Sequence, residues 1–198
     1  HRTKRPWQGK TESTAGEKRP EYDRECYLCP GNTRAGGAKN PDYTETFVFT
    51  NDFAALLPET PGESITDDSL FKAEGERGTC RVVCFSPRHD LTIARMKTGQ
   101  IETVIETWKK EYRALGKLDY ISYVQIFENK GDLMGCSNPH PHGQIWANQR
   151  IPDLPRRETG HQYRYAETHG RCLLCSYVEA EIERRERVVV ENDSFVCL

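Results

Sequence analysis

Two histidines in the run SNPHPHGQIWAN, residues 137–148, offer the clearest chemistry in this sequence. His140 and His142 are two positions apart, so in extended backbone both side chains leave the same face. Such a pair can share a metal ion, flank a phosphate, or divide these tasks. A neutral imidazole is nucleophilic near neutral pH, and the phosphoramidate that it forms is readily attacked by a second phosphate. The alternative is that both rings merely cap a turn around two prolines.

The residues beside the histidines favour phosphate chemistry over a simple turn. Gln144 can donate an amide hydrogen to a non-bridging phosphate oxygen, and Gly143 would let a bulky phosphate approach closely. The backbone around Gly135, with Cys136 and Ser137, could form a nest of donors for the same negative charge. This combination predicts a site for phosphoryl or nucleotidyl transfer.

A C-x-x-C pair, Cys26 and Cys29, supplies half of a tetrahedral zinc site in a loop rich in turn residues. His89 and His140 are the candidates for the missing half. A redox dithiol is less favoured because Pro-Gly follows Cys29, so no helix begins there. A chance pair of reduced thiols is the remaining alternative.

A second C-x-x-C pair, Cys172 and Cys175, has only His161 and His169 nearby. Here the residues favour a pair of cysteines without a metal.

Composition excludes several classes of protein. The 198 residues suffice for one large domain, or for one domain and part of another, and the net charge of −2 argues against broad attraction to nucleic acid or anionic lipid. No apolar run approaches the ~20 residues that span a bilayer, and the N-terminus does not resemble a secretory signal. Without an export signal, reduced thiols and a cytoplasmic location are expected.

The elements that must position these residues can be read from hydrophobic periodicity. Apolar residues at helical spacing predict a helix over 98–116, with Gly116 as its stop. Residues 176–186 predict a second helix. Alternating or β-branched runs predict strands that begin at Phe47 and end at the Asn51–Asp52 turn, and strands within 80–87, 120–131 and 143–148. The last two would be an antiparallel pair that presents the loop between them at one end.

The sequence also contains a weak internal echo. CYLC is followed by FVFTNDF, and CLLC is followed by VVVENDSF, in the same order and with an apolar strand before each Asn-Asp pair. The order favours duplication over chance. Because the second copy ends at Leu198 within an apolar strand, we expect a fragment of a longer protein with two repeats.

These blocks resemble the galactose-1-phosphate uridylyltransferases of the histidine-triad superfamily. The likeness runs from KRPWQG through CYLCPGN, VCFSPRH and MGCSNPHPHGQIWAN to CLLCSYVEAE, and it is weaker over 58–78 and 150–170. It implies an α+β fold with a histidine-triad-like antiparallel half-barrel sheet and flanking helices. Residues 1–150 would form the first repeat, with the zinc site and the nucleophile, and residues 151–198 a connector and the truncated start of a second, similar repeat.

The resemblance implies a ping-pong reaction that moves UMP from UDP-glucose to galactose 1-phosphate, giving UDP-galactose and glucose 1-phosphate. His142 matches the nucleophile that becomes uridylylated, with Gln144 and Ser137 as further catalytic residues. The matching zinc ligands are Cys26, Cys29, His89 and His140.

Further positions carry over from the family to the substrate. The matching UDP-sugar contacts are Arg2, Lys4, Arg5, Ala35, Asn51, Asp52, Asn129, Gly135, Cys136, Ser137 and Gln144. Ala35 stands where some members have a larger apolar residue. From residue types alone, the basic residues at the N-terminus fit a solvated arm equally well.

The resemblance also implies features that this chain would hold only in part. Glu158 matches a ligand of a second metal, usually iron, whose three histidine ligands would lie beyond Leu198. Members are homodimers, and the partner's later residues close the hexose phosphate pocket. No nucleic-acid partner and no membrane association are expected.

Two other functions remain open from the residues. One is a related histidine-triad nucleotide phosphorylase or adenylyltransferase that uses His142 with a different acceptor. The other is a non-catalytic zinc-binding module, for example one that binds nucleic acid, against which the slightly acidic charge argues.

Overall fold

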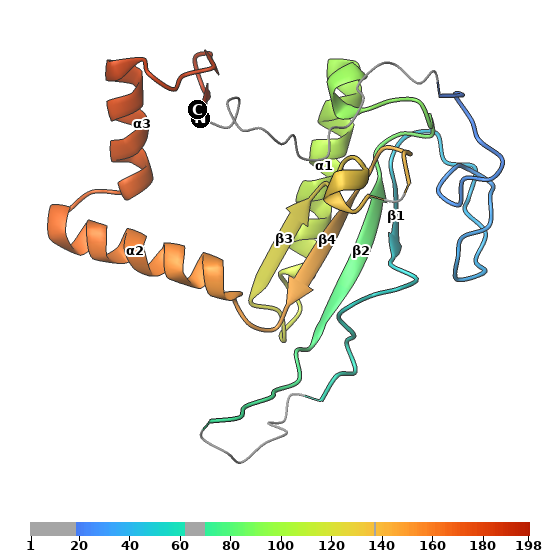
Figure 1. Cartoon of the computed structure of the whole chain (residues 1–198), viewed down its shortest axis with the longest axis horizontal. Coiled ribbons are helices and arrows are strands. Elements are labelled where there is room, and N and C mark those ends of the chain that lie inside the picture. Colours follow the sequence, from blue (N-terminus) through green and yellow to red (C-terminus); the bar gives the residue numbers. More distant parts are fainter. Residues whose placement is uncertain (1–18, 62–69, 137) are drawn as a thin grey trace, which may run out of the picture. The chain divides into compact units, whose positions relative to one another are not determined.

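The computed structural model describes residues 19–61, 70–136 and 138–198 (Figure 1). Four of the predicted site residues, Arg2, Lys4, Arg5 and Ser137, lie outside these ranges. The chain divides into two compact units, residues 1–150 and residues 151–198.

An antiparallel sheet organises the first unit. The described part of this unit contains the strands β1 (Phe47–Thr50), β2 (Gly78–Cys84), β3 (Tyr123–Phe127) and β4 (His142–Asn148). Their order in the sheet is β1-β2-β4-β3, and every neighbouring pair is antiparallel. All four strands fall where the sequence predicts them. Together with the helices, this sheet confirms the α+β class.

Helix α1 (Thr98–Leu115) covers one face of this sheet (Figure 1) and confirms the helix predicted from periodicity. Its buried Val104 and Leu115 belong to the same apolar cluster as Val83 of β2 and Ile145 of β4. Two short 3-10 segments, η2 (Ile93–Arg95) and η3 (Asp132–Met134), lie in the connections before α1 and after β3.

Strand β4 separates the core from the site through its alternation. Its burial pattern alternates strictly, so Ile145 and Ala147 are fully buried while His142 and Gln144 are half-buried on the opposite face. That opposite face carries a second apolar cluster, in which residues 26–29, called here the cysteine loop, pack against Val82 and Cys84 of β2. The register of one strand therefore aims the histidine away from the helix-covered core.

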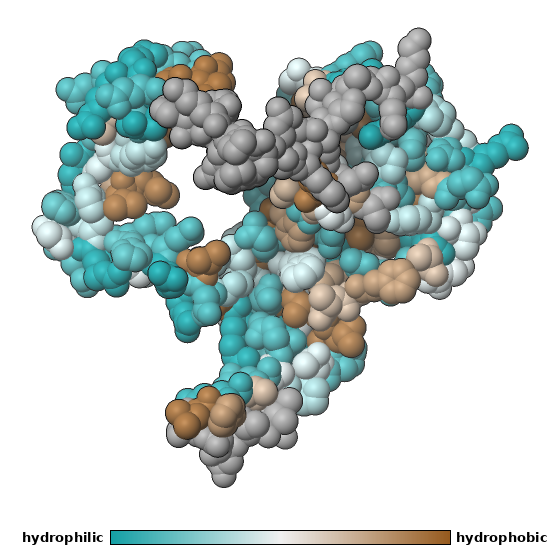
Figure 2. All heavy atoms as spheres, in the orientation of Figure 1, coloured by the Kyte–Doolittle hydropathy of each residue, from teal (hydrophilic) through white to brown (hydrophobic). Residues whose placement is uncertain are grey.

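A long excursion, residues 51–77, connects β1 to β2. Apolar side chains gather at its tip, away from the sheet (Figure 2), where Leu70 is 83% exposed and Phe71 is 71% exposed. Its described residues form no helix and no named strand before Gly78, where β2 begins.

The second unit contains α2 (Asp153–His169), α3 (Leu173–Arg184) and a hairpin of β5 (Val190–Glu191) with β6 (Val196–Cys197). Helix α3 confirms the helix predicted over 176–186. Helix α2 was not predicted, because it buries no residue fully and has no strong apolar stripe. The sequence predicts an apolar strand before Asn192 and another in which the chain ends at Leu198, and β5 and β6 form these two strands on either side of a turn at Asn192.

The internal echo extends to turn geometry. The Asn51 side-chain oxygen accepts a hydrogen bond from the backbone N–H of Phe53 at 3.0 Å, and the Asn192 oxygen accepts one from Ser194 at 2.9 Å. Both are turns in which an asparagine mimics a backbone group two residues on. In the described part of the chain, no helix is long and apolar enough to cross a membrane.

Candidate functional site

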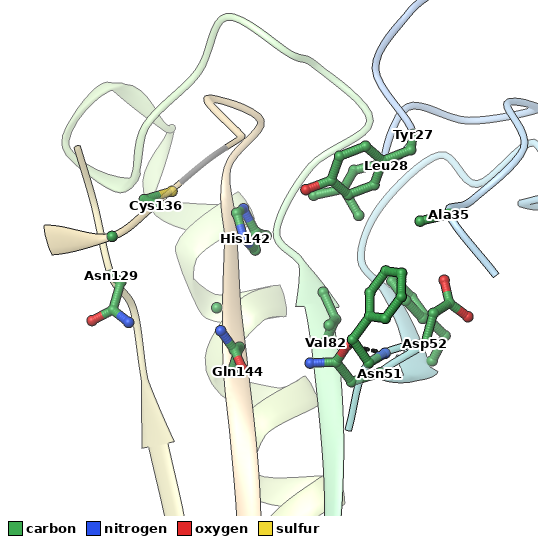
Figure 3. Close-up of a pocket in the computed structure, with 14 residues that line it drawn as sticks. Tyr27, Leu28, Ala35, Asn51, Asp52, Val82, Asn129, Cys136, His142 and Gln144 are labelled. Atoms are coloured by element: carbon green, nitrogen blue, oxygen red, sulfur yellow. Dashed lines mark hydrogen bonds between the residues drawn. The ribbon is translucent and has the colours of Figure 1, made fainter. Parts of the chain in front are cut away.

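A cavity of about 310 Å³ opens on the face of the sheet opposite α1 (Figure 3). This size lies at the lower end of the range for small-molecule sites. His142 and Gln144 project into it from β4, between Asn129 and Cys136 on one side and Asn51 and Asp52 on the other. Its lining residues are Tyr27, Leu28, Ala35, Phe49, Asn51, Asp52, Phe53, Val82, Asn129, Gly135, Cys136, His142, Gly143 and Gln144.

The structure brings together all of the described residues that the sequence predicts for substrate binding. They come from four separate segments: the turn that contains Ala35, the end of β1, the loop after β3, and β4. Sequence reasoning missed the apolar lining, of which Phe49 and Val82 are typical. The alternation along β1 and β2 could have placed these two side chains on the His142 face, because they are directly paired across the strands.

One hydrogen bond fixes how His142 can react. Its Nδ1 lies 2.7 Å from the backbone oxygen of His140. A carbonyl oxygen can only accept, so Nδ1 carries the proton and donates it. The lone pair of the neutral ring is therefore on Nε2, the nitrogen that is left for an electrophile in the cavity.

The amide of Gln144 is oriented in a comparable way. The indole N–H of Trp146, two residues further along β4, donates to Gln144 Oε1 at 3.0 Å. Indole is only a donor, so the amide oxygen must face Trp146 and the NH₂ group is left for the cavity. The side chain can then donate to an oxygen of a bound phosphate.

The reason for a glycine at position 143 differs from the expected one. A Cβ at Gly143 would lie 2.8 Å from the backbone oxygen of Phe127 and 2.8 Å from the Phe85 ring. The requirement thus comes from close packing of the neighbouring strand and of the core. Close approach of a phosphate is not what demands the glycine.

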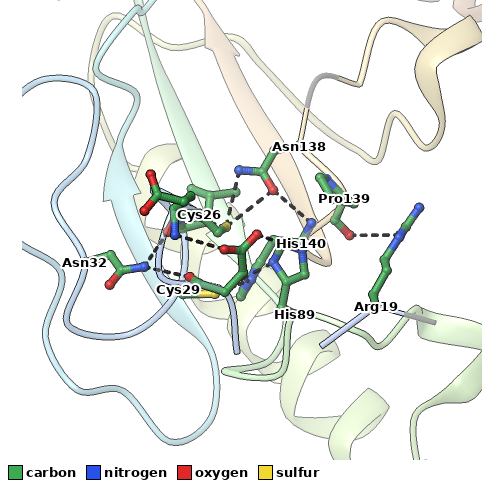
Figure 4. A network of polar contacts seen from close by, with 11 residues as sticks. Arg19, Cys26, Cys29, Asn32, His89, Asn138, Pro139 and His140 are labelled. Carbon is green, nitrogen blue, oxygen red and sulfur yellow. Dashed lines mark hydrogen bonds and ion pairs between the residues drawn. The ribbon is translucent and has the colours of Figure 1, made fainter. Parts of the chain in front are cut away.

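A buried cluster of two thiols and two imidazoles lies beside the cavity (Figure 4). The ligand atoms of Cys26, Cys29, His89 and His140 all lie within 4.8 Å of one another. Cys29 Sγ is 3.7 Å from His89 Nδ1 and 3.5 Å from His140 Nδ1. The four residues predicted as zinc ligands are thus placed together, and they could hold a metal ion.

Hydrogen bonds around the cluster fix which nitrogen of His140 faces the sulfurs. Its Nε2 lies 2.9 Å from the backbone oxygen of Ser86 and 3.0 Å from the hydroxyl of Tyr43. Nε2 is therefore the protonated nitrogen, and Nδ1 presents its lone pair to the cluster. The backbone N–H of His140 donates to Asn138 Oδ1 at 2.9 Å, which holds the residue in place.

The electrostatics of the cluster fit a divalent cation with N and S ligands. Burial lowers the pKa of His140 to about 4, so its ring is neutral and able to ligate near neutral pH. Burial also lowers the pKa of His89. The pKa of the Cys29 thiol is raised to about 12, first by burial, because a buried thiolate without a cation is unfavourable. Two thiols and two imidazoles are a donor set typical of structural zinc.

The remaining predicted residues lie in the second unit. Glu158 is exposed on α2, and among the described residues it belongs to no group of three or more potential metal ligands. Cys172 and Cys175 are exposed free cysteines at the start of α3.

Comparisons with known proteins agree on one family. The model for "Galactose-1-phosphate uridyl transferase, N-terminal domain" matches residues 1–152. A galactose-1-phosphate uridylyltransferase of Haemophilus influenzae is 48% identical over the whole chain, and one of Kluyveromyces lactis is 45% identical. A solved structure titled "Structure of uridylyltransferase" aligns with a TM-score of 0.76 and 27% identity, over 97% of this chain and 59% of that one. The chain spans 56% and 57% of the lengths of the two curated relatives.

Proposed function

This chain belongs to the galactose-1-phosphate uridyl transferase family, and from that premise we propose that it carries the nucleotidyl-transfer site of a UDP-glucose–hexose-1-phosphate uridylyltransferase. The observation that carries the proposal is the orientation of His142. Its Nδ1 is engaged by the His140 carbonyl oxygen, so Nε2 is free in a cavity lined by the predicted nucleotide contacts.

In the first half-reaction, Nε2 of His142 attacks the α-phosphorus of UDP-glucose. A P–N bond forms, the P–O bond to the departing phosphate breaks, and glucose 1-phosphate leaves. Positive charge develops on the ring as this bond forms, and the Nδ1–H···O bond to His140 stabilises that charge. The amide NH₂ of Gln144, held by Trp146, donates to a non-bridging oxygen.

In the second half-reaction, a phosphate oxygen of galactose 1-phosphate attacks the same phosphorus. The P–N bond breaks, the electron pair returns to Nε2, and UDP-galactose forms. Because both half-reactions use one nucleophile, the donor's product must leave before the acceptor binds, which gives ping-pong kinetics. Ser137 and the basic residues Arg2, Lys4 and Arg5 are further proposed contacts outside the described residues.

We infer that zinc is the ion held by the four clustered residues. Bound zinc would supply structural cross-linking of the cysteine loop to the strand that carries the nucleophile. His140 and His142 are separated by one proline, so anchoring the first histidine restricts the position of the second.

Other features of the whole protein are extensions of the same proposal. Glu158 would contribute to a second metal site, with iron as the expected ion, completed by histidines from outside this sequence. We expect a homodimer in the cytoplasm, and neither nucleic acid nor membrane as a partner. Support for these points comes from the family alone.

Intact-mass measurement after incubation with UDP-glucose tests the nucleophile. We expect the protein to gain the mass of one UMP and the adduct to map to His142. The variant His142→Asn should gain none. His161→Asn, which removes an exposed histidine of α2, is the matched control and should label like the wild type.

Equal labelling of His142→Asn would refute the assignment of the nucleophile. Labelling by ADP-glucose in preference to UDP-glucose would favour the adenylyltransferase alternative. If no nucleotide labels the protein while oligonucleotides bind it, a zinc-binding module becomes the better explanation.

A further inference from the structure

Asn40 links the cysteine loop to the loop that forms one wall of the cavity. Its side chain is buried, with the residue only 3% exposed. The amide nitrogen donates to the backbone oxygens of Tyr27 and Cys29, each at 3.0 Å, and the amide oxygen accepts from Arg34 Nη1 at 3.3 Å. Asn40 therefore joins the backbone at a clustered cysteine to the guanidinium of Arg34.

Arg34 continues this chain of contacts to the far side of the cavity. Its Nε lies 3.2 Å from Oδ2 and 3.4 Å from Oδ1 of Asp52, and its guanidinium carbon is 4.2 Å above the Phe49 ring. The ion pair is shielded, since the two side chains are 13% and 17% exposed. Pairs of this kind are screened less than surface pairs, so they can hold a fixed geometry.

The backbone around Arg34 forms a tight turn that brings Ala35 to the cavity. Arg34 N donates to the Ala38 oxygen at 2.8 Å, and Gly37 N donates to the Arg34 oxygen at 2.9 Å. A Cβ at Gly36 would lie 2.7 Å from Asp52 Oδ1, so the turn sits directly against this carboxylate. In this set of contacts, the side chain of Arg34 holds the turn that carries Ala35 against the end of β1, through Asp52 and the Phe49 ring.

We infer that Arg34 is a positioning residue that sets the width of the nucleotide cavity and couples it, through Asn40, to the metal cluster. The inference rests on the proposed function, because the nucleotide is the ligand whose affinity would depend on this width. Two consequences distinguish it from a purely structural arginine. The variant that lacks the guanidinium binds nucleotide more weakly, and the metal no longer strengthens that binding.

The test measures UDP affinity by calorimetry for zinc-loaded and chelator-treated protein. For the wild type we expect zinc to tighten UDP binding by about fivefold or more, a typical size of coupling between two sites. Zinc-loaded Arg34→Met should bind UDP about tenfold more weakly, with the effect of zinc reduced below about twofold. The control Arg77→Met removes a comparable contact, over the Tyr120 ring at 3.8 Å, away from the cavity lining and should behave like the wild type.

A conservative variant separates the effect of Arg34 on UDP affinity from its effect on the coupling to zinc. Lysine can pair with Asp52, but it lacks the planar fork that also reaches Asn40. Arg34→Lys should therefore keep most of the UDP affinity and lose most of the effect of zinc. If Arg34→Met fails to fold, Arg34→Lys still tests the coupling between zinc and UDP binding. If chelation unfolds the protein, the UDP affinities of the zinc-loaded variants still test the role of Arg34 in nucleotide binding.

The outcomes are distinct. Wild-type affinity in both zinc-loaded Arg34 variants would overturn the inference and leave the proposed function standing. A full zinc effect in the variants would overturn the coupling. A wild-type protein that binds no UDP would overturn the proposed function and this inference together.

Discussion

His140 and His142 share a strand end but use opposite ring nitrogens. At His140, contacts to Nε2 leave Nδ1 for the cysteines, whereas at His142 a contact to Nδ1 leaves Nε2 for the cavity. In both rings a backbone carbonyl oxygen selects the protonated nitrogen. The proposed division of the two residues between metal binding and attack on phosphorus therefore depends on carbonyl groups, which no substitution of a side chain can remove directly.

Loss of the Tyr43 hydroxyl should weaken zinc binding without removing a ligand. This hydroxyl donates to the Leu28 oxygen at 2.6 Å and contacts His140 Nε2 at 3.0 Å. We expect Tyr43→Phe to lower zinc affinity by about tenfold, the lower end of such outer contacts. Competition with a chromophoric chelator measures this. Tyr22→Phe, which removes an exposed hydroxyl bonded to Asn32, is the control, and equal affinities of the two variants would contradict the expectation.

Zinc affinity should rise with pH around neutrality. The Cys29 thiol, with its pKa raised to about 12 by burial, is protonated in the metal-free protein and must lose its proton to ligate. His140, with a pKa lowered to about 4, is already neutral and adds no proton release. Each proton released makes affinity rise about tenfold per pH unit. Calorimetry in buffers of different ionisation enthalpy counts the protons, and a count of zero would refute this assignment.

At the scale of the elements, the sheet and α1 form a support that leaves one face for chemistry. The apolar cluster under α1 includes Val104 and Leu115, both 1% exposed. The opposite face holds the cysteine loop and the cavity. Since the cluster that contains Val104 and Leu115 lies on the α1 side of β4, its packing can be tested separately from the site.

The variant Leu115→Ala should destabilise the protein while leaving the site intact. Removing a fully buried leucine side chain costs about 2–5 kcal/mol. Urea unfolding would measure the free energy of unfolding, and zinc affinity under native conditions should be unchanged. Ile105→Ala, at a position of α1 that is 42% exposed, is the comparison and should cost much less. A similar loss in both variants would contradict this account of the core.

The sequence predicts those parts of the fold and of the site whose residues form a pattern within one short segment. Apolar periodicity predicts the helices α1 and α3, and alternating or β-branched runs predict the four strands of the sheet, because these signals lie within each element. Helix α2 has little apolar surface to bury and so leaves no such signal. The Asn40–Arg34–Asp52 contacts join residues far from any motif, and their partners depend on tertiary folding. Cys26, Cys29 and His140 belong to the local patterns C-x-x-C and His-x-His, whereas His89 belongs to neither and is assigned to the site by the family resemblance.

At the scale of the whole molecule, all described residues of the cavity and of the metal cluster lie in the first compact unit. The boundary falls after Arg150, two residues beyond the end of β4. We propose that this unit is the first repeat and that residues 151–198 form the connector and the start of a second.

A protein shortened to residues 1–150 should keep the proposed zinc site. All four clustered residues and the hydrogen bonds around them come from this unit, so we expect zinc affinity equal to that of the 198-residue chain. Chelator competition on both proteins makes the comparison. Loss of zinc binding in a shortened protein that retains its circular dichroism would show that the second unit contributes to the site.

The alternation of β4 has one more consequence, for errors in folding. Side chains on a strand repeat every two residues, so a slip of one position in its pairing would turn His142 toward α1 and bring Ile145 and Ala147 out to the cavity. Such a misfolded chain would lose its hydrophobic packing and displace the proposed nucleophile together. A stable fold with shifted strands and a displaced His142 is therefore disfavoured, because the same register determines both the packing of β4 and the position of this histidine.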